Sequence, residues 1–275
     1  MNEPSISVDD AGEGPPIVLL HGLTATRRYV LQGSRHLLGR GYRLLSYDAR
    51  GHGESGAPED PAAYAYDLMV GDLERVLALK DLERPVLVGS SMGAHVATAF
   101  ALANPERVAA LVQITPAYMG HGRKQPDELL HWDRLAAALE AGDIDAFITI
   151  SAIDELPERW REGVELGIRQ RLERHRDLNA VAAALRVVPR SDAWEGLEPL
   201  RELEVPTLVV ASRDDVDPGH PMFIAEEYAR LLPRGELAVE EPDAPPLAWQ
   251  GSRLSRTIGD FLERIDPELF GIPAE

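Results

Sequence analysis

A serine flanked by two glycines is the feature that most constrains the fold of this chain. Residues 85–88 form a short apolar, β-branched run that begins with a proline, as expected for a buried strand. Residues 94–103 are rich in alanine and predict a helix. Gly89-x-Ser91-x-Gly93 joins the two through a turn that keeps β-carbons out of a crowded bend. This pattern is typical of a nucleophile elbow, a strained turn that exposes one serine hydroxyl above a sheet.

Composition limits the size, the partners and the compartment of the protein. A chain of 275 residues can form one large α/β domain with an inserted subdomain. The formal net charge of −18 argues against nucleic acid or an anionic membrane as partner, because both bind basic surfaces. The absence of cysteine excludes disulfides, a cysteine nucleophile and thiolate metal sites. Neither a basic and apolar leader nor a membrane-length apolar run is evident, so we expect a cytoplasmic protein.

The alternation of strand-like and helical patterns predicts the organisation of the chain. Over most of its length this alternation favours a mostly parallel sheet with helices on both faces. Between about residues 118 and 200 the apolar residues recur at helical spacing instead. We therefore predict an α/β core formed by residues 1–117 and 201–275, with a helical lid inserted at residues 118–200.

A turn after the first core strand is a candidate anion-binding turn. His21-Gly22-Leu23 directly follows the apolar run at residues 17–20. Such a turn can aim a backbone N–H at a developing oxyanion, and the N–H groups of Leu23 and Met92 are the expected pair of donors. His21 is expected to have a structural role.

In three segments, which occur in this order, the chain resembles the α/β-hydrolase superfamily. They are His21-Gly22, residues 47–55 (YDARGHGES) and residues 89–93 (GSSMG). The resemblance to small esterases, lactonases and cofactor-free haloperoxidase-like members covers residues 5 to about 264. It implies an α/β-hydrolase fold, a nucleophile at Ser91 and a structural role for His52. Many epoxide hydrolases and haloalkane dehalogenases of this fold have aspartate at the elbow, so the serine argues against both.

The resemblance also implies an acidic residue in a loop after a late strand. That loop corresponds to residues 211–218 (ASRDDVDP). Matching Ser212 to the glycine that usually opens the loop places the acid at Asp215, with Asp214 as the alternative. The aspartates of this loop, Asp217 included, could equally form a solvated acidic turn with a helix N-cap.

The histidine that the family places after its last strand is missing. Residues 240–250 (EEPDAPPLAWQ) occupy this region, with Ala244 at the vacated histidine position. We expect the turn around Ala244 to converge with Ser91 and Asp215. Removal of the base from a Ser-His-Asp unit costs about 10⁴ to 10⁶ in turnover. Either the position has been changed from histidine to trap a complex, or another histidine acts, or the protein does not carry out ordinary acyl transfer.

His220 is the best substitute base, because it lies just beyond the acid loop at the start of a predicted helix. Its position between Gly219 and Pro221 also suits a surface or cap residue. His95 follows Ser91 by about one helical turn and is expected in the core. The lid contributes three further candidates, which are His121, His131 and His175. No metal-ligand spacing and no dinucleotide-binding glycine pattern occurs, so we predict neither a metal nor a cofactor.

Two functions are consistent with these observations. The first is a hydrolase that acts on a small hydrophobic ester, lactone or thioester through Ser91, with Asp215 orienting the base. The second is a protein of the same fold that binds a small molecule or supports a non-hydrolytic reaction without a complete triad. The elbow and the turn at Leu23 favour the first function, and Ala244 favours the second.

Overall fold

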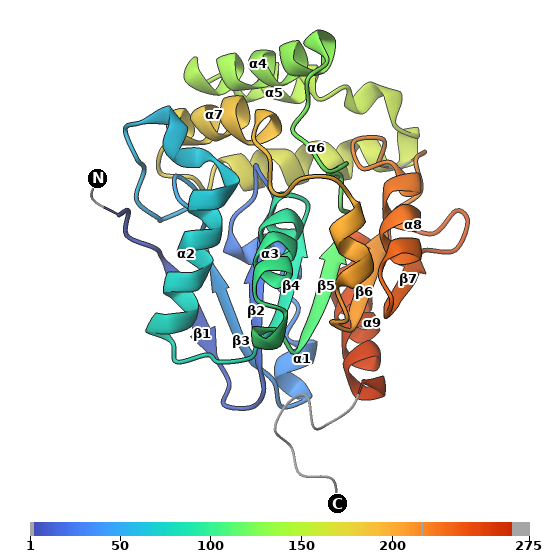
Figure 1. The fold of residues 1–275 in the computed structure, drawn as a ribbon. Helices are drawn as coiled ribbons and strands as arrows, with labels where there is room; N and C mark the ends of the chain where they lie inside the picture. The colour runs from blue at the N-terminus through green and yellow to red at the C-terminus, as the bar shows by residue number, and fades with distance from the viewer. Residues whose placement is uncertain (1–2, 216, 266–275) are drawn as a thin grey trace, which may run out of the picture.

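A seven-stranded sheet runs through the middle of the protein in the computed structural model, which describes residues 3–215 and 217–265 (Figure 1). The strand order is β1-β3-β2-β4-β5-β6-β7, with β1 antiparallel to β3 and the other neighbours parallel. The strands are β1 (Val8–Ala11), β2 (Pro16–Leu20), β3 (Arg43–Tyr47), β4 (Val86–Ser90), β5 (Ala110–Ile114), β6 (Thr207–Ala211) and β7 (Gly235–Val239). The predicted fold class, a mostly parallel sheet flanked by helices, is confirmed.

Helices cover both faces of this sheet because alternate residues of its strands point to opposite sides. Leu87 packs in a core with α2, α3 and α8, whereas Val86 and Val88 pack in a second core with α1 and α9. The helices are α1 (His36–Gly39), α2 (Tyr66–Leu79), α3 (Met92–Ala103), α8 (Met222–Leu231) and α9 (Gly251–Arg264). Short 3₁₀ turns are η1 (Arg27–Tyr29), η2 (Pro61–Tyr64), η3 (Pro105–Arg107) and η7 (Leu247–Trp249).

In the described chain, the segment between β5 and β6 contains helices and no strand. They are α4 (Pro126–Glu140), α5 (Ile144–Ile150), α6 (Glu158–Leu172) and α7 (Leu178–Val187), with the 3₁₀ turns η4 (Ile153–Glu155), η5 (Val188–Arg190) and η6 (Glu198–Glu202). α4 packs against α7, and α6 lies across the carboxyl ends of the central strands (Figure 1). Ligands of parallel sheets bind at this edge. The lid boundaries at residues 118 and 200 stay a prediction.

Buried polar groups fix the loop that follows β3. Arg50 donates to both carboxylate oxygens of Asp72 on α2, at 2.6 and 2.7 Å. His52 is fully buried, and its Nε2 lies 2.6 Å from the carbonyl oxygen of Leu23. The loop therefore holds the turn that carries Leu23 in place. Within the described residues, no helix has the length and apolar character needed to cross a membrane.

Candidate active site

Ser91 occupies a strained turn between β4 and α3. Its φ is 49° and its ψ is −113°, a region that costs a non-glycine residue about 1–3 kcal/mol. A β-carbon on Gly89 would lie 2.3 Å from the carbonyl oxygen of Gly93, and one on Gly93 would lie 2.3 Å from that of Leu20. The Ser91 N–H donates to the carbonyl oxygen of Ile114 at 2.9 Å, which helps to hold the turn. The elbow thus presents the serine at the carboxyl edge of the sheet.

A chain of hydrogen bonds joins Ser91, His220 and Asp217. His220 Nε2 lies 2.9 Å from Ser91 Oγ, and His220 Nδ1 lies 2.9 Å from Asp217 Oδ1. A carboxylate beside Nδ1 keeps a proton on that nitrogen, so that the lone pair of Nε2 can accept the serine O–H. A hydroxyl, an imidazole and a carboxylate in this order can generate a nucleophile from the serine.

The environment of His220 increases its basicity. Burial of the imidazole lowers its pKa, but the negative charge of Asp217 and the hydrogen bond to it raise the pKa above the ordinary histidine value. The positive charges of Arg123 and Arg171, both in the segment between β5 and β6, act in the opposite direction. His220 therefore accepts a proton more readily than an unperturbed imidazole, mainly because of Asp217.

The expected oxyanion donors lie on both sides of the elbow. Met92 is the first residue of α3, where a backbone N–H has no acceptor within its own helix. A β-carbon on Gly22, next to Leu23, would lie only 3.6 Å from Ser91 Cβ, so the two turns are in close contact. Donation by Leu23 and Met92 to an oxyanion stays a prediction.

The acid loop differs from the expectation. Asp215, the expected acid, is exposed, and Asp214 accepts a hydrogen bond from the Met222 N–H at 2.7 Å, at the start of α8. The partner of His220 is Asp217, because the His220 N–H donates to the Asp217 carbonyl oxygen at 3.1 Å and closes a tight turn. This turn brings the side chains of Asp217 and His220, three residues apart, to the same side of the loop. An Asp-Pro-Gly-His sequence is a typical turn signal that could have indicated the pair.

A buried glutamate that the sequence analysis missed ties the Ala244 turn to the acid loop. Glu240 is 1% exposed and follows β7 directly. Its carboxylate accepts the N–H of Arg213 at 2.7 Å and the N–H of Leu247 at 3.0 Å. The Ala244 N–H donates to the carbonyl oxygen of Glu241 at 3.1 Å, within the turn that Glu240 anchors. The only sequence signal for the anchoring role of Glu240 was its position as a carboxylate at the carboxyl end of a strand.

Two further histidines close to the elbow are buried in neutral form. His95 Nδ1 lies 2.8 Å from the Tyr66 hydroxyl, and its Nε2 accepts the Ala117 N–H at 3.1 Å. His21 Nε2 accepts the Ala49 N–H at 2.9 Å. Burial, with a smaller effect of neighbouring charge, lowers the pKa of each to about 3. Both have structural contacts on both ring nitrogens, and neither is placed to act on Ser91.

The three histidines of the segment between β5 and β6 differ in their surroundings. His175 Nδ1 accepts the Gly53 N–H at 2.9 Å, and its Nε2 lies 3.3 Å from the carbonyl oxygen of Thr24. It therefore links the segment between β5 and β6 to the loops that follow β2 and β3. His121 and His131 are exposed. The part of the chain that the structure describes contains no group of three or more histidine, aspartate or glutamate side chains that could hold a metal ion.

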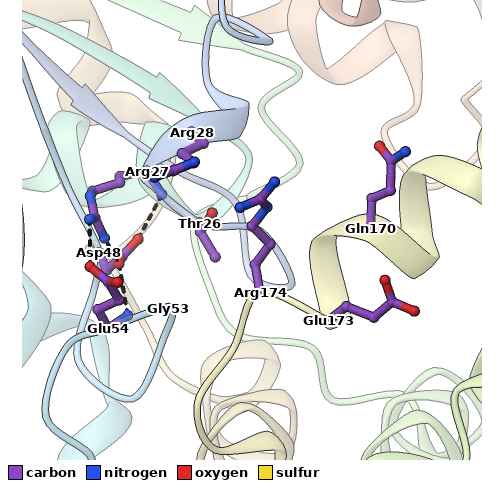
Figure 2. Close-up of a pocket in the computed structure, with 9 residues that line it drawn as sticks. All are labelled: Thr26, Arg27, Arg28, Asp48, Gly53, Glu54, Gln170, Glu173 and Arg174. Atoms are coloured by element: carbon purple, nitrogen blue, oxygen red, sulfur yellow. Dashed lines mark hydrogen bonds and ion pairs between the residues drawn. The ribbon is translucent and has the colours of Figure 1, made fainter.

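A polar cavity of about 530 Å³ lies between η1, the loop after β3 and the carboxyl-terminal end of α6 (Figure 2). It is lined by Thr26, Arg27, Arg28, Asp48, Gly53, Glu54, Gln170, Glu173 and Arg174. Arg27 forms ion pairs with Asp9, Asp48 and Glu54, so its charge is already balanced. Ser91, Asp217 and His220 are not among the lining residues, and this cavity is therefore distinct from the hydrogen-bonded chain at the elbow.

We expect stability to fall as the pH falls from about 6.5 toward 3, because His21 and His95 are neutral in the folded protein and protonate when it unfolds. Their stabilising contribution is fully present above pH 6.5. Below it, each group removes about 1.4 kcal/mol per pH unit from the free energy of unfolding. Urea denaturation between pH 7 and pH 5 measures this slope, which His95→Gln should reduce by about 1.4 kcal/mol per unit. The exposed control His121→Gln should leave it unchanged, and equal slopes in all three proteins would contradict the prediction.

The chain belongs to the α/β hydrolase fold family, whose sequence pattern matches residues 15–248. Epoxide hydrolase 2 from Siraitia grosvenorii is 33% identical over 115 residues, which cover 42% of this chain and 36% of that enzyme. The chain thus spans about a third of the length of this relative and of others like it.

Two solved structures are similar to this chain over nearly its whole length. A thermophilic esterase from Thermogutta terrifontis, with malate bound, has a TM-score of 0.76 at 27% identity and covers 96% of this chain and 94% of its own. The enol-lactonase from Burkholderia xenovorans LB400 has a TM-score of 0.75 at 21% identity, covering 94% of this chain and 96% of its own. At that identity the second likeness shows the fold alone. Membership of this family supports hydrolase activity.

Proposed function

We propose that the protein is a serine hydrolase that acts on a small ester, lactone or thioester. The observation that carries the proposal is the hydrogen-bonded chain from Ser91 through His220 to Asp217 at the carboxyl edge of the sheet. The likeness to an esterase at 27% identity supports the carboxylic ester class. The proposed substrate is a small molecule, because the elbow lies beneath a helical lid. The proposed location of the protein is the cytoplasm.

In the proposed mechanism, His220 Nε2 takes the proton of Ser91 as the serine oxygen attacks the carbonyl carbon. The backbone N–H groups of Leu23 and Met92 stabilise the negative oxygen of the tetrahedral intermediate. Asp217 stabilises the imidazolium, which then protonates the leaving alcohol or thiol. Water attacks the acyl group in the second half of the reaction, with His220 again acting first as base and then as acid.

The alternative, a binding protein without a complete triad, rested on the alanine at position 244. That argument loses its force when another imidazole is hydrogen-bonded to the serine, as His220 is. Epoxide opening of the kind that uses an elbow carboxylate is disfavoured because position 91 is a serine. Hydrolysis through an acyl-serine is therefore the function that the geometry supports best.

Covalent labelling tests the proposal without knowledge of the substrate. A fluorophosphonate probe should label the protein once and release no label on denaturation, because it phosphonylates an activated serine. Ser91→Ala should abolish labelling, whereas Ser90→Ala, the neighbouring serine at the end of β4, is the matched control and should retain it. Labelling that survives in Ser91→Ala, or that is absent from the unmodified protein, would contradict the proposed nucleophile.

A further inference from the structure

The polar cavity of Figure 2 has no part in the proposed function. Its volume of about 530 Å³ is that of a small-molecule site, for which about 300–1,000 Å³ is usual. Its lining comes from three parts of the chain: η1 with the residue before it, the loop after β3, and α6 with the two residues that follow it. A ligand in this cavity would therefore occupy a site separate from Ser91 and tie together segments that are distant in sequence.

One wall of the cavity is fixed by contacts within the protein. The Arg27 side chain is 8% exposed and forms ion pairs with three carboxylates, those of Asp9, Asp48 and Glu54. Asp48 is fully buried and also accepts the N–H groups of Arg27 at 2.8 Å and of Glu54 at 2.9 Å. This wall is formed before any ligand binds, so little ordering is needed on binding.

Two other arginines of the cavity lack a counter-ion among the described residues. Neither Arg28 nor Arg174 forms an ion pair or a side-chain hydrogen bond there. Arg28 belongs to η1, whereas Arg174 follows α6 and extends toward Thr26 and Arg28 (Figure 2). Both are exposed, so a ligand can reach them. Two guanidinium groups that line one space repel each other, and an anion between them relieves this repulsion.

The remaining groups of the cavity suit hydroxyl groups better than a second anion. Thr26 is 3% exposed, and its hydroxyl has no hydrogen-bond partner in the described part of the chain. Gln170 can both donate and accept through its amide. The carboxylate of Glu173 can accept an O–H group but repels negative charge. A ligand with one anionic group and several hydroxyls therefore matches the lining.

We propose that this cavity binds the phosphate monoester of a small sugar or polyol, with the phosphate between Arg28 and Arg174 and the hydroxyls toward Gln170 and Glu173. A phosphate monoester carries about −1.5 to −2 charges at pH 7, and its oxygens match the paired donors of a guanidinium. A water molecule takes about 30 Å³ of liquid volume, so a cavity of about 530 Å³ has room for much more than a phosphate ion. Because the net charge of −18 repels anions at long range, recognition requires local cations.

Calorimetry with the unmodified protein at pH 7.5 in 0.1 M NaCl tests the inference. Glucose 6-phosphate should bind at least about tenfold more tightly than glucose, which lacks the phosphate, and than inorganic phosphate, which lacks the hydroxyls. Arg28→Gln and Arg174→Gln should each weaken the binding of glucose 6-phosphate by about 10- to 100-fold, because each removes a charged pair of donors. Arg169→Gln is the matched control and should leave the affinity unchanged, since this arginine of α6 is already ion-paired with Asp145 at 2.6 Å.

A carboxylate variant gives a second test that removes no arginine. Glu173→Gln lowers the repulsion of an anion in the cavity, so inorganic phosphate should bind to it about two- to fivefold more tightly than to the unmodified protein. No change in this variant would count against a phosphate in the cavity, even if the arginine variants failed to fold.

Two results with the sugar phosphate would overturn the inference. Equal affinity for inorganic phosphate and glucose 6-phosphate would mean that the site takes free phosphate only. Binding that Arg28→Gln and Arg174→Gln leave unchanged would mean that the ligand lies elsewhere, the Ser91 site included. These measurements do not depend on Ser91, so the inference and the proposed function stand or fall separately.

Discussion

Replacement of His220 by alanine should reduce the kcat of ester hydrolysis by about 10⁴ to 10⁶. The Nε2 atom of this histidine is 2.9 Å from the Ser91 hydroxyl, and the other histidines near the elbow have structural contacts on both nitrogens. Without this imidazole the serine oxygen keeps its proton and is a weak nucleophile. Hydrolysis of 4-nitrophenyl acetate, followed at pH 8 with the unmodified protein as reference, measures the loss.

Two variants serve as controls for this prediction. His121→Ala changes an exposed histidine between β5 and β6 and should leave the rate unchanged. Ala244→His places an imidazole at the position where the family has one. Because His220 already occupies the hydrogen-bonding position on Ser91, this change should not raise the rate. A rise of about tenfold or more with Ala244→His, or near-normal activity in His220→Ala, would mean that His220 is not the base.

The core of the fold was predictable because the sequence of each element by itself favours that element. Residues 86–88 are apolar, and two of the three are β-branched valines, so they form a strand that is buried on both faces. Gly89 and Gly93 are required because a β-carbon at either position would lie 2.3 Å from a backbone oxygen, and such steric demands appear directly in the sequence as glycines. The position of Ser91 follows from the same pattern, which is why the elbow could be located without a structure.

The acid was harder to predict because two signals competed for it. The match to the family assumed that the acid lies as many residues after Ser212 as it lies after the corresponding glycine in the family. This assumption placed the acid at Asp215. The local signal, a Pro-Gly turn between Asp217 and His220, requires no such assumption and gives the pair that is hydrogen-bonded. The expectation that His220 could replace the missing base drew on its position just beyond the acid loop at the start of a predicted helix, and neither expectation used the turn signal.

Other parts of the site depend on how distant segments dock and have no local signal. Glu240 bonds to backbone groups 27 and 7 residues away, on two different loops. Contacts of this kind follow from tertiary packing, which pattern analysis does not resolve.

Asp217→Asn should lower kcat by about 10⁴ and shift the pH dependence of the remaining activity downward. His220 acts as a base only when neutral, so activity increases as the pH rises through its pKa. Asp217 raises that pKa, whereas burial and the positive charges of Arg123 and Arg171 lower it. Without the carboxylate only the lowering effects remain, and the pH of half-maximal activity must fall. The asparagine amide can also donate to Nδ1, which places the imidazole proton on Nε2, opposite the serine oxygen, where it prevents deprotonation of Ser91.

Neighbouring aspartates of the same loop provide matched controls for this pH profile. Asp215→Asn changes an exposed side chain and should alter neither kcat nor the pH of half-maximal activity. Asp214→Ala removes the hydrogen bond from the Met222 N–H at the start of α8, so it should lower the free energy of unfolding by about 1 kcal/mol without moving the profile. The opposite pattern, a large loss and a shifted profile in Asp215→Asn with normal behaviour in Asp217→Asn, would identify Asp215 as the acid. Of the two side chains, only Asp217 is within hydrogen-bonding distance of His220. The pH of half-maximal activity therefore responds to the loss of the Asp217 carboxylate. A simple loss of protein stability would not shift this pH.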